Sequence, residues 1–426
     1  MWRAWVLVAG LCFGLMLLHD QTAPSARTAE CDATALLDQP QHAITSLQAC
    51  GRQGRHGLII DEWHWEVLAS SVMVLKLRGI HCVDVLTSSR RDLLGMHEVL
   101  RGWGMHIGVV TSAAAVVRTL QARNASLDAI LFQTWSASAH VAQLEALLPL
   151  LTPHSLVLAG CHNGPRRLPP QLGGRGYRRT LLSFYPSPPA IFYGGWPWPS
   201  TIEFLPTYFG PSPPSRPSSV AAPLRVAPRV EIIVLGELVF DKRDYALLES
   251  LAADAHASAA DDPLRRARIR VFGRLKERRR AQRLLNRTRG LVLHIADGGF
   301  RAMVQALRDA AFVMPLITDR PHRGREYATG AKMTSSISLA LAFERPLILW
   351  RELAHGYARR GLRLDHQLMH DGGKAAPAGL AEAVRAAVRL FDDRTAYDTS
   401  ILALRQQKRE HFCGAARALR EQDVGV

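Results

Sequence analysis

Short apolar runs alternate with stretches of helical spacing along most of this chain. From residue 56 the pattern predicts a buried strand at Leu58-Ile59-Ile60, a helix over 65–77 that ends at Gly79, and a second strand over 83–86. Further strands are expected at 106–110, 127–132 and 155–159, with a helix over 140–151. Strands that alternate with helices favour a parallel, doubly wound sheet.

The pattern starts again after an interruption rich in proline. Prolines cluster between residues 186 and 228, too densely for regular structure, and this predicts a stiff linker. Beyond it we expect strands at 231–235, 267–272, 291–295, 312–316 and 347–350, helices at 245–255 and 301–309, and helical structure from 380 to about 420. The predicted fold class is α/β, with two doubly wound Rossmann-like domains, an N-terminal signal anchor and C-terminal helices.

The first residues have the character of a targeting segment. Residues 4–18 carry no charge and follow Arg3, as in the apolar core of a signal peptide or a short signal anchor, and both readings remain open. We therefore expect the following units: the targeting segment at 1–20, a stem at 21–54, an N-terminal domain at 55–185, the linker at 186–228, a C-terminal domain at 229–370 and helices at 371–426.

Composition narrows the class of protein. Apolar residues make up 48% of the chain and charged residues 21%, which is the balance of a globular protein. The net charge of +16 suits anionic substrates, nucleic acid or acidic membranes. Six cysteines without a Cys-x-x-Cys pair fit an oxidising compartment and argue against a cysteine-based zinc site. The sequons at Asn124 and Asn286 would be glycosylation acceptors there.

The stretch 326–350 carries the most specific signal. Thr334, Ser335 and Ser336 precede an apolar segment, and the turn Glu344-Arg345-Pro346 then leads into a buried strand. A helix that starts on hydroxyl groups presents unpaired N–H groups to an anion, and in an α/β sheet such a helix borders the crevice at the carboxyl ends of the strands. An ordinary capped helix without a ligand is the alternative.

Residues 231–350 resemble the donor-binding half of GT-B-fold glycosyltransferases, and residues 56–163 are compatible with the acceptor domain of that fold. The resemblance rests on Val234-Leu235-Gly236, Lys242-Arg243, Val271-Phe272-Gly273, Met314-Pro315-Leu316 and the 334–346 motif. It implies a nucleotide sugar, UDP- or GDP-linked, as co-substrate and no other cofactor. The residues implied to hold the donor are Gly236, Lys242, Arg243, Gly273, Thr334, Ser335 and Ser336.

Lys242 and Arg243 would offset the charge of the departing diphosphate without a metal ion, since basic side chains can stabilise such a leaving group. A solvated helix start is the other reading of this pair. The chain also departs from the family: many retaining members carry two glutamates with seven residues between them. Counting on from Glu326 reaches Thr334, and counting back from Glu344 reaches Ser336. Glu326 remains a candidate to face the sugar, with Asp319 as a comparable one.

The first predicted strand ends on the polar cluster Asp61-Glu62-Trp63-His64-Trp65. Asp61 or His64 would serve as the base that activates an acceptor hydroxyl, although an acidic residue before a helix is also a plain N-cap. The segments 133–135 and 161–163 end later strands and are weaker candidates for acceptor contacts.

Eight basic residues between Gly273 and Arg289 are expected to lie all round a helix as a solvated face. No aromatic residues interleave with them, which argues against nucleic acid as a partner. The sequence thus predicts a type II, single-pass membrane glycosyltransferase of the Golgi or endoplasmic reticulum that acts on a glycan or glycoprotein. The rival hypothesis is a two-lobed binding protein for a small anionic ligand.

Overall fold

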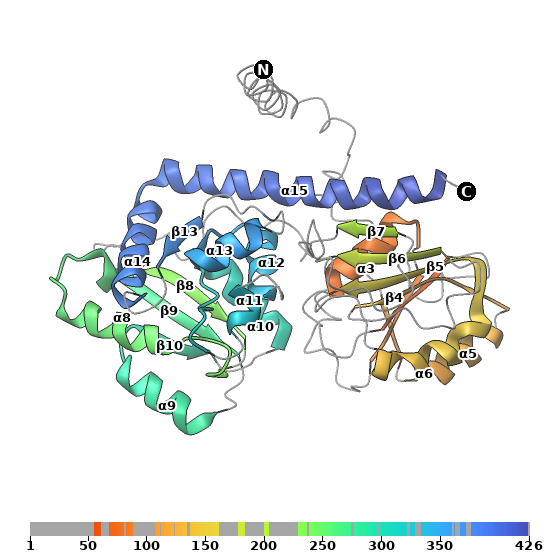
Figure 1. Cartoon of the computed structure of the whole chain (residues 1–426), viewed down its shortest axis with the longest axis horizontal. Helices are drawn as coiled ribbons and strands as arrows, with labels where there is room; N and C mark the ends of the chain where they lie inside the picture. The colour runs from red at the N-terminus through yellow and green to blue at the C-terminus, as the bar shows by residue number, and fades with distance from the viewer. Residues whose placement is uncertain are drawn as a thin grey trace, which may run out of the picture.

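A computed structural model shows two parallel sheets, each flanked by helices, and a long C-terminal helix that reaches both (Figure 1). The structure describes residues 55–60, 68–80, 82–87, 107–110, 112–122, 124–133, 137–161, 178–183, 200–203, 229–236, 238–273, 277–295, 299–321, 324–328, 334–359, 362, 367–371 and 376–424. The predicted signal anchor and stem lie outside the described residues.

Seven described strands form the first sheet, in the order β3-β2-β1-β4-β5-β6-β7, and all neighbours are parallel. Their bounds are β1 (His56–Ile60), β2 (Cys82–Leu86), β3 (Ile107–Val110), β4 (Leu127–Phe132), β5 (Leu151–Cys161), β6 (Arg178–Ser183) and β7 (Ser200–Glu203). The helices of this half are α3 (Leu68–Leu77), α5 (Ala113–Ala122), α6 (Ala137–Leu147) and the 3₁₀ turn Leu148–Leu150. The central strands β1 and β4 are buried on both faces, as expected of a doubly wound sheet.

Strand β7 lies inside the stretch 186–228 that the sequence predicts to be a linker. Residues Ser200–Glu203 pair with β6, so the first sheet extends beyond residue 185. The strand occupies the edge of the sheet, where flanking prolines cost no ladder hydrogen bond. The proline-rich stretch therefore includes an edge strand of the first sheet and is not a linker throughout.

The second sheet has six described strands in the order β10-β9-β8-β11-β12-β13, again all parallel. Its strands are β8 (Val230–Leu235), β9 (Ala267–Phe272), β10 (Val292–Ile295), β11 (Phe312–Val313), β12 (Leu347–Trp350) and β13 (Gln367–His370). The helices are α8 (Ala246–Ala257), the 3₁₀ turn η6 (Pro263–Arg266), α9 (Arg278–Arg287), α10 (Gly299–Asp309), α11 (Gly324–Ala328), α12 (Ser335–Ala342) and α13 (Arg351–Ala358).

The arginine-rich segment is a helix, as predicted, but its charges do not surround it. Ala281 and Leu284 of α9 are buried in the core of the second domain, so one face of the helix is apolar and packed. The arginines lie on the remaining surface. The expectation of charge on all sides was wrong because Ala281 and Leu284, three residues apart, form a short apolar stripe on one face of the helix. Two apolar residues among many arginines give only a weak signal in the sequence.

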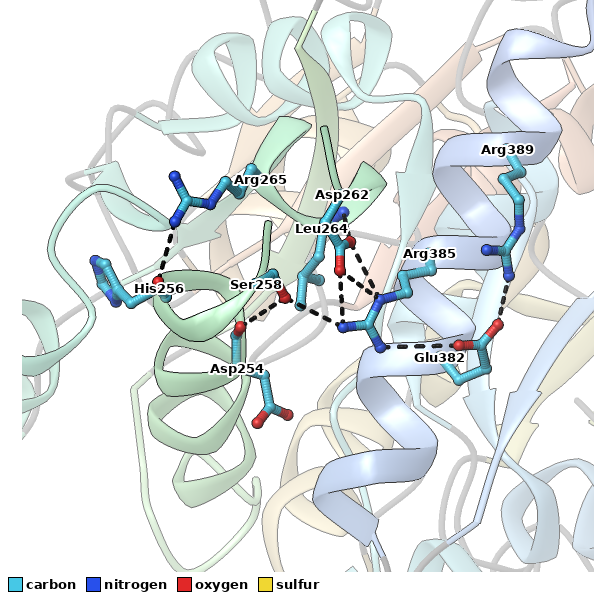
Figure 2. A network of polar contacts seen from close by, with 9 residues as sticks. All are labelled: Asp254, His256, Ser258, Asp262, Leu264, Arg265, Glu382, Arg385 and Arg389. Atoms are coloured by element: carbon cyan, nitrogen blue, oxygen red, sulfur yellow. Dashed lines mark hydrogen bonds and ion pairs between the residues drawn. The ribbon is translucent and has the colours of Figure 1, made fainter. Parts of the chain in front are cut away.

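Helix α14 (Ala376–Asp392) closes the second domain through an ion pair with the turn after α8. The guanidinium of Arg385 donates to both carboxylate oxygens of Asp262, each at 3.1 Å from Nε, and its Nη2 lies 3.3 Å from Ser258 Oγ (Figure 2). Asp262 also accepts from the N–H of Leu264 as the N-cap of η6. Burial opposes ionisation of Asp262, but the hydrogen bonds from Leu264, Ser258 and Arg385 outweigh it and lower its pKa.

Helix α15 (Arg394–Val424) connects the two halves of the molecule. It packs against α12 in the second domain and against β7 and α3 in the first, and Figure 1 shows it running across both sheets. At its start, the hydroxyl of Tyr397 donates to the carbonyl of Ala311 at 2.8 Å. Farther along, Arg405 and Lys408 both bind the buried carboxylate of Glu344.

The described part of the chain contains no helix that is long and apolar enough to cross a membrane. Cys82 and Cys413 are both disulfide-bonded.

Candidate functional site

Two glycines end adjacent strands at the carboxyl edge of the second sheet. Gly236 follows β8 with a φ of +112°, and Gly273 follows β9 with a φ of +145°. The Gly236 N–H donates to the carbonyl of Phe272 at 2.8 Å, so the two turns lie side by side. Positive φ angles favour glycine, and at Gly236 the absence of a side chain leaves room for the guanidinium of Arg243. Both glycines are thus placed where the sequence predicts them.

Arg243 lies beneath the Gly236 turn and is only 4% exposed. Its Nη2 donates to the carbonyl of Leu235, and a Cβ on Gly236 would collide with the guanidinium. Within the described residues no Asp or Glu forms an ion pair with Arg243, and its Nε has no hydrogen-bond partner. A buried cation without a counter-charge is costly, and an anion bound at the turn would offset that cost. Burial excludes the solvated reading for Arg243.

Lys242 connects this turn to α11 and, through it, to α13. Its Nζ lies 5.1 Å from the centre of the Tyr327 ring, which belongs to α11. Tyr327 is close enough to Tyr357 of α13 to influence its ionisation, and Tyr357 in turn accepts a hydrogen bond from the Thr334 N–H at 3.2 Å. Burial raises the pKa of Tyr357 above its usual range, so its hydroxyl stays protonated. These contacts link Lys242 to the start of α12.

The three hydroxyl residues at the start of α12 have separate positions. Thr334 is the N-cap, and its Oγ1 accepts from the Ser336 N–H at 3.4 Å. The Ser336 side chain is buried, and its Oγ lies 3.4 Å from Thr334 Oγ1. Ser335 is half-buried and is the hydroxyl that remains accessible. Thr334 therefore acts as a cap, as one of the two sequence readings has it, while the first turn still points toward the carboxyl edge of the sheet.

The loop after β11 is held to the Lys242-Arg243 turn by Asp244. The Asp244 N–H donates to the carbonyl of Leu316 at 3.0 Å, and the Thr318 hydroxyl donates to the Asp244 carboxylate at 3.0 Å. Leu316 has a φ of +55°, which is strained for a bulky side chain. Burial raises the pKa of Asp244, against the hydrogen bond from Thr318 and the charge of Arg320.

The sequence reading missed Asp244, Thr318, Tyr327 and Tyr357 as parts of this edge. Asp244 directly follows the predicted basic pair, and this adjacency is a signal in the sequence for its place in the turn. Tyr327 and Tyr357 lie 30 residues apart and carry no local signal; only the packing of α11 against α13 brings them together.

The acidic candidates of this domain lie apart from one another. Glu326, on α11, and Asp319, in the loop after β11, are both exposed and border the edge. Glu344 is fully buried at the far end of α12 and binds α15, so it has no place in the site. Glu344, one of the two glutamates from which the family spacing was counted, thus holds the end of α12 against α15.

Fewer of the candidates in the first domain can be placed. Asp61 and His64 lie outside the described residues. Gln133 follows β4 and is buried, and its N–H donates to the carbonyl of Ile60 at 3.1 Å. Gly160 of β5 lies so close that a Cβ there would collide with the Gln133 carbonyl. The carboxyl ends of β1, β4 and β5 therefore meet at one edge, as predicted.

No family model matches the sequence, and no curated protein matches it either. Three solved structures with a similar overall arrangement are AviGT4, a glycosyltransferase involved in avilamycin A biosynthesis (15% identity, 84% of this chain and 98% of that chain, TM-score 0.42), MurG of Acinetobacter baumannii (10%, 85% and 99%, 0.40) and the N-terminal domain of Candida albicans trehalose-6-phosphate phosphatase (11%, 88% and 97%, 0.47). With identities of 15% or less and TM-scores below 0.5, these similarities carry no argument about superfamily or role. The structure itself confirms the predicted fold class at the level of two parallel sheets with alternating helices.

Proposed function

We propose that the chain is a glycosyltransferase that moves a sugar from a nucleotide-sugar donor, UDP- or GDP-linked, to a glycan or glycoprotein acceptor. The buried cation of Arg243 carries this proposal. It lies at the carboxyl edge of the second sheet, beneath a glycine turn and without a carboxylate partner among the described residues. A nucleoside diphosphate is a ligand whose charge would satisfy it.

The surrounding groups support a diphosphate rather than a single carboxylate. Lys242 is half-buried beside Arg243, and the first turn of α12 supplies backbone N–H groups next to the Ser335 hydroxyl. One of these cations would be enough to balance the single negative charge of a carboxylate. Two cations and a helix N-terminus together match the larger negative charge of a diphosphate. When the sugar leaves the donor, charge develops on the diphosphate, and fixed donors at this place would lower the barrier. The proposal requires no metal ion.

The acceptor would approach from the first domain. Asp61 and His64 remain the proposed bases, since they follow β1 directly in the sequence. Glu326 is proposed to face the sugar from α11. For the location we propose the lumen of the Golgi or endoplasmic reticulum, with the N-terminal segment as a type II membrane anchor. The disulfide bonds of Cys82 and Cys413 support an oxidising compartment.

A donor-hydrolysis assay tests the function. The purified chain should release nucleoside diphosphate slowly from at least one UDP- or GDP-sugar in the absence of acceptor. Replacing Lys242 or Arg243 by Ala should lower this rate by about 100-fold, the effect expected when a group that stabilises leaving-group charge is lost. If ligand binds but no donor is hydrolysed or transferred, the chain is the two-lobed binding protein instead.

A further inference from the structure

Helix α9 presents a row of arginines with few acidic partners. Arg278, Arg279 and Arg283 on α9, and Arg289 just after it, are exposed, and within the described part of the chain none of them pairs with Asp or Glu. Two other arginines of this segment do have acidic partners: Arg280 lies 3.4 Å from Glu277, and Arg287 lies 3.0 Å from Glu249. Even after these two ion pairs, the surface keeps a strong positive charge.

The placement of the charges opposes the stability of the helix. Arg278, Arg279 and Arg280 occupy its first turn, which contains no acidic residue. The helix dipole disfavours cations at this end, and like charges four residues apart, as at Arg279 and Arg283, repel each other. The N-cap Glu277 makes no capping hydrogen bond; its carboxylate accepts from the Phe240 N–H at 3.0 Å instead. An anion bound at this turn would relieve both effects.

The surface also borders the candidate donor site. Helix α9 follows β9 and Gly273, so it begins at the same carboxyl edge as the Gly236 turn. Phe240 belongs to the loop that carries Lys242 and Arg243, and the guanidinium of Arg280 stacks 4.1 Å from the centre of its ring. A ligand along α9 would therefore end close to the place where the sugar is transferred.

The chemistry of the helix favours a chain of oxoanions over a membrane. The apolar face, Ala281 and Leu284, is packed in the core and cannot enter a bilayer. The described cations of the helix are all arginines, whose planar fork matches the oxygens of sulfate or phosphate groups. We propose that α9 is a docking surface for a sulfated or phosphorylated glycan chain, and that this chain is the acceptor. The second part rests on the proposed function.

A heparin oligosaccharide is the probe that tests this surface in the full-length protein, with dextran as an uncharged control. Two double variants of equal charge are compared: Arg279→Gln/Arg283→Gln on α9, and Arg118→Gln/Arg265→Gln at exposed positions elsewhere. A control variant of equal charge is needed because a chain of net charge +16 attracts any polyanion. The α9 variant should bind heparin roughly 30-fold more weakly and show a shallower salt dependence, whereas the control should change by less than about three-fold.

Thermal unfolding supplies a second readout. Because glutamine is a good helix former and the lost charges oppose the helix dipole, the α9 variant should melt at the same temperature or higher. Equal losses of heparin binding in both variants would overturn the proposal, as would tighter α9-dependent binding to phosphatidylserine vesicles than to heparin. The binding assay needs no catalysis, so failure here with intact donor hydrolysis would leave the proposed function standing.

Discussion

The carboxylate of Glu344 lies 3.4 Å from Lys408 Nζ, and both side chains are at most 2% exposed. Arg405 binds the other carboxylate oxygen at 2.8 Å. Glu344 follows the end of α12 with a φ of +54°. The Glu344 N–H donates to the carbonyl of Leu341, and the Arg345 N–H donates to the carbonyl of Ala340. This is the Schellman arrangement, whose left-handed position glycine usually occupies. The residue is strained locally but joins α12 to α15.

Replacing Glu344 by Gly should therefore destabilise the protein even though it removes backbone strain. Relief of the left-handed conformation is worth about 1 kcal/mol, whereas a buried cation left without its partner costs about 3 kcal/mol. We expect a net loss of about 2 kcal/mol in urea unfolding. The double variant Glu344→Gly/Lys408→Met should recover part of it. A single variant as stable as wild type would show that the ion pairs contribute nothing.

The Gly236 turn offers a matched pair of substitutions. Gly236 and Gly290 both have left-handed φ angles, +112° and +93°, but a Cβ on Gly290 meets nothing within 4 Å, whereas one on Gly236 collides with Arg243. Both Ala variants should lose about 1 kcal/mol of stability from backbone strain. Only Gly236→Ala should also lower donor hydrolysis, by 10-fold or more, because it displaces the guanidinium. Similar activity in the two variants would argue against a role for this contact.

His370, at the end of β13, predicts a dependence of stability on pH. Burial lowers its pKa, against the backbone carbonyl and charge of Asp371. As the pH falls, the His370 imidazole is therefore protonated at a higher pH in the unfolded chain than in the folded one. Its contribution to the free energy of unfolding is fully present above about pH 6.5 and is lost as the pH falls toward the folded-state pKa. His370→Asn removes this titration. Melting temperatures measured from pH 7 to 5 should fall less steeply in the variant; parallel curves would contradict the assignment.

The two sequons differ in accessibility. Asn124 lies in an exposed turn with a φ of +51°, and Ser126 is exposed as well. Asn286 lies on α9, and the hydroxyl of Thr288 is buried and donates to the carbonyl of Leu284. If the chain enters the secretory pathway, Asn124 should carry the main glycan. Endoglycosidase should then increase the mobility of wild type and of Asn286→Gln, but not of Asn124→Gln. Unchanged mobility in all three would contradict the proposed location.

Much of the fold could be predicted because its central strands are uninterrupted apolar runs. The strands Leu127–Phe132, Ala267–Phe272 and Leu347–Trp350 have the bounds that the sequence indicates. Strands near one edge of the first sheet were harder to predict because they contain little apolar sequence. The edge strand β7 follows a proline, and its neighbour β6 begins with two arginines.

The site was predictable in its glycines and basic residues but not in its electrostatics. Arg243 could be named from its position after a strand, yet its burial and missing counter-charge arise only when the loop folds back under Gly236. Glu344 shows the opposite case. A charged turn normally indicates solvent, and the partners that bury it, Arg405 and Lys408, lie more than 60 residues away.

The central claim is that Arg243 receives the diphosphate of a nucleotide, and calorimetric titration tests it most directly. UDP and GDP are titrated alongside uridine and guanosine into wild type, Arg243→Met and the exposed control Arg118→Met. For the preferred base, we predict that Arg243→Met weakens the diphosphate by about 10- to 100-fold, the range of a charge-assisted hydrogen bond, and leaves the nucleoside unchanged. The control should match wild type. Equal affinity of wild type and Arg243→Met for the diphosphate would contradict the account.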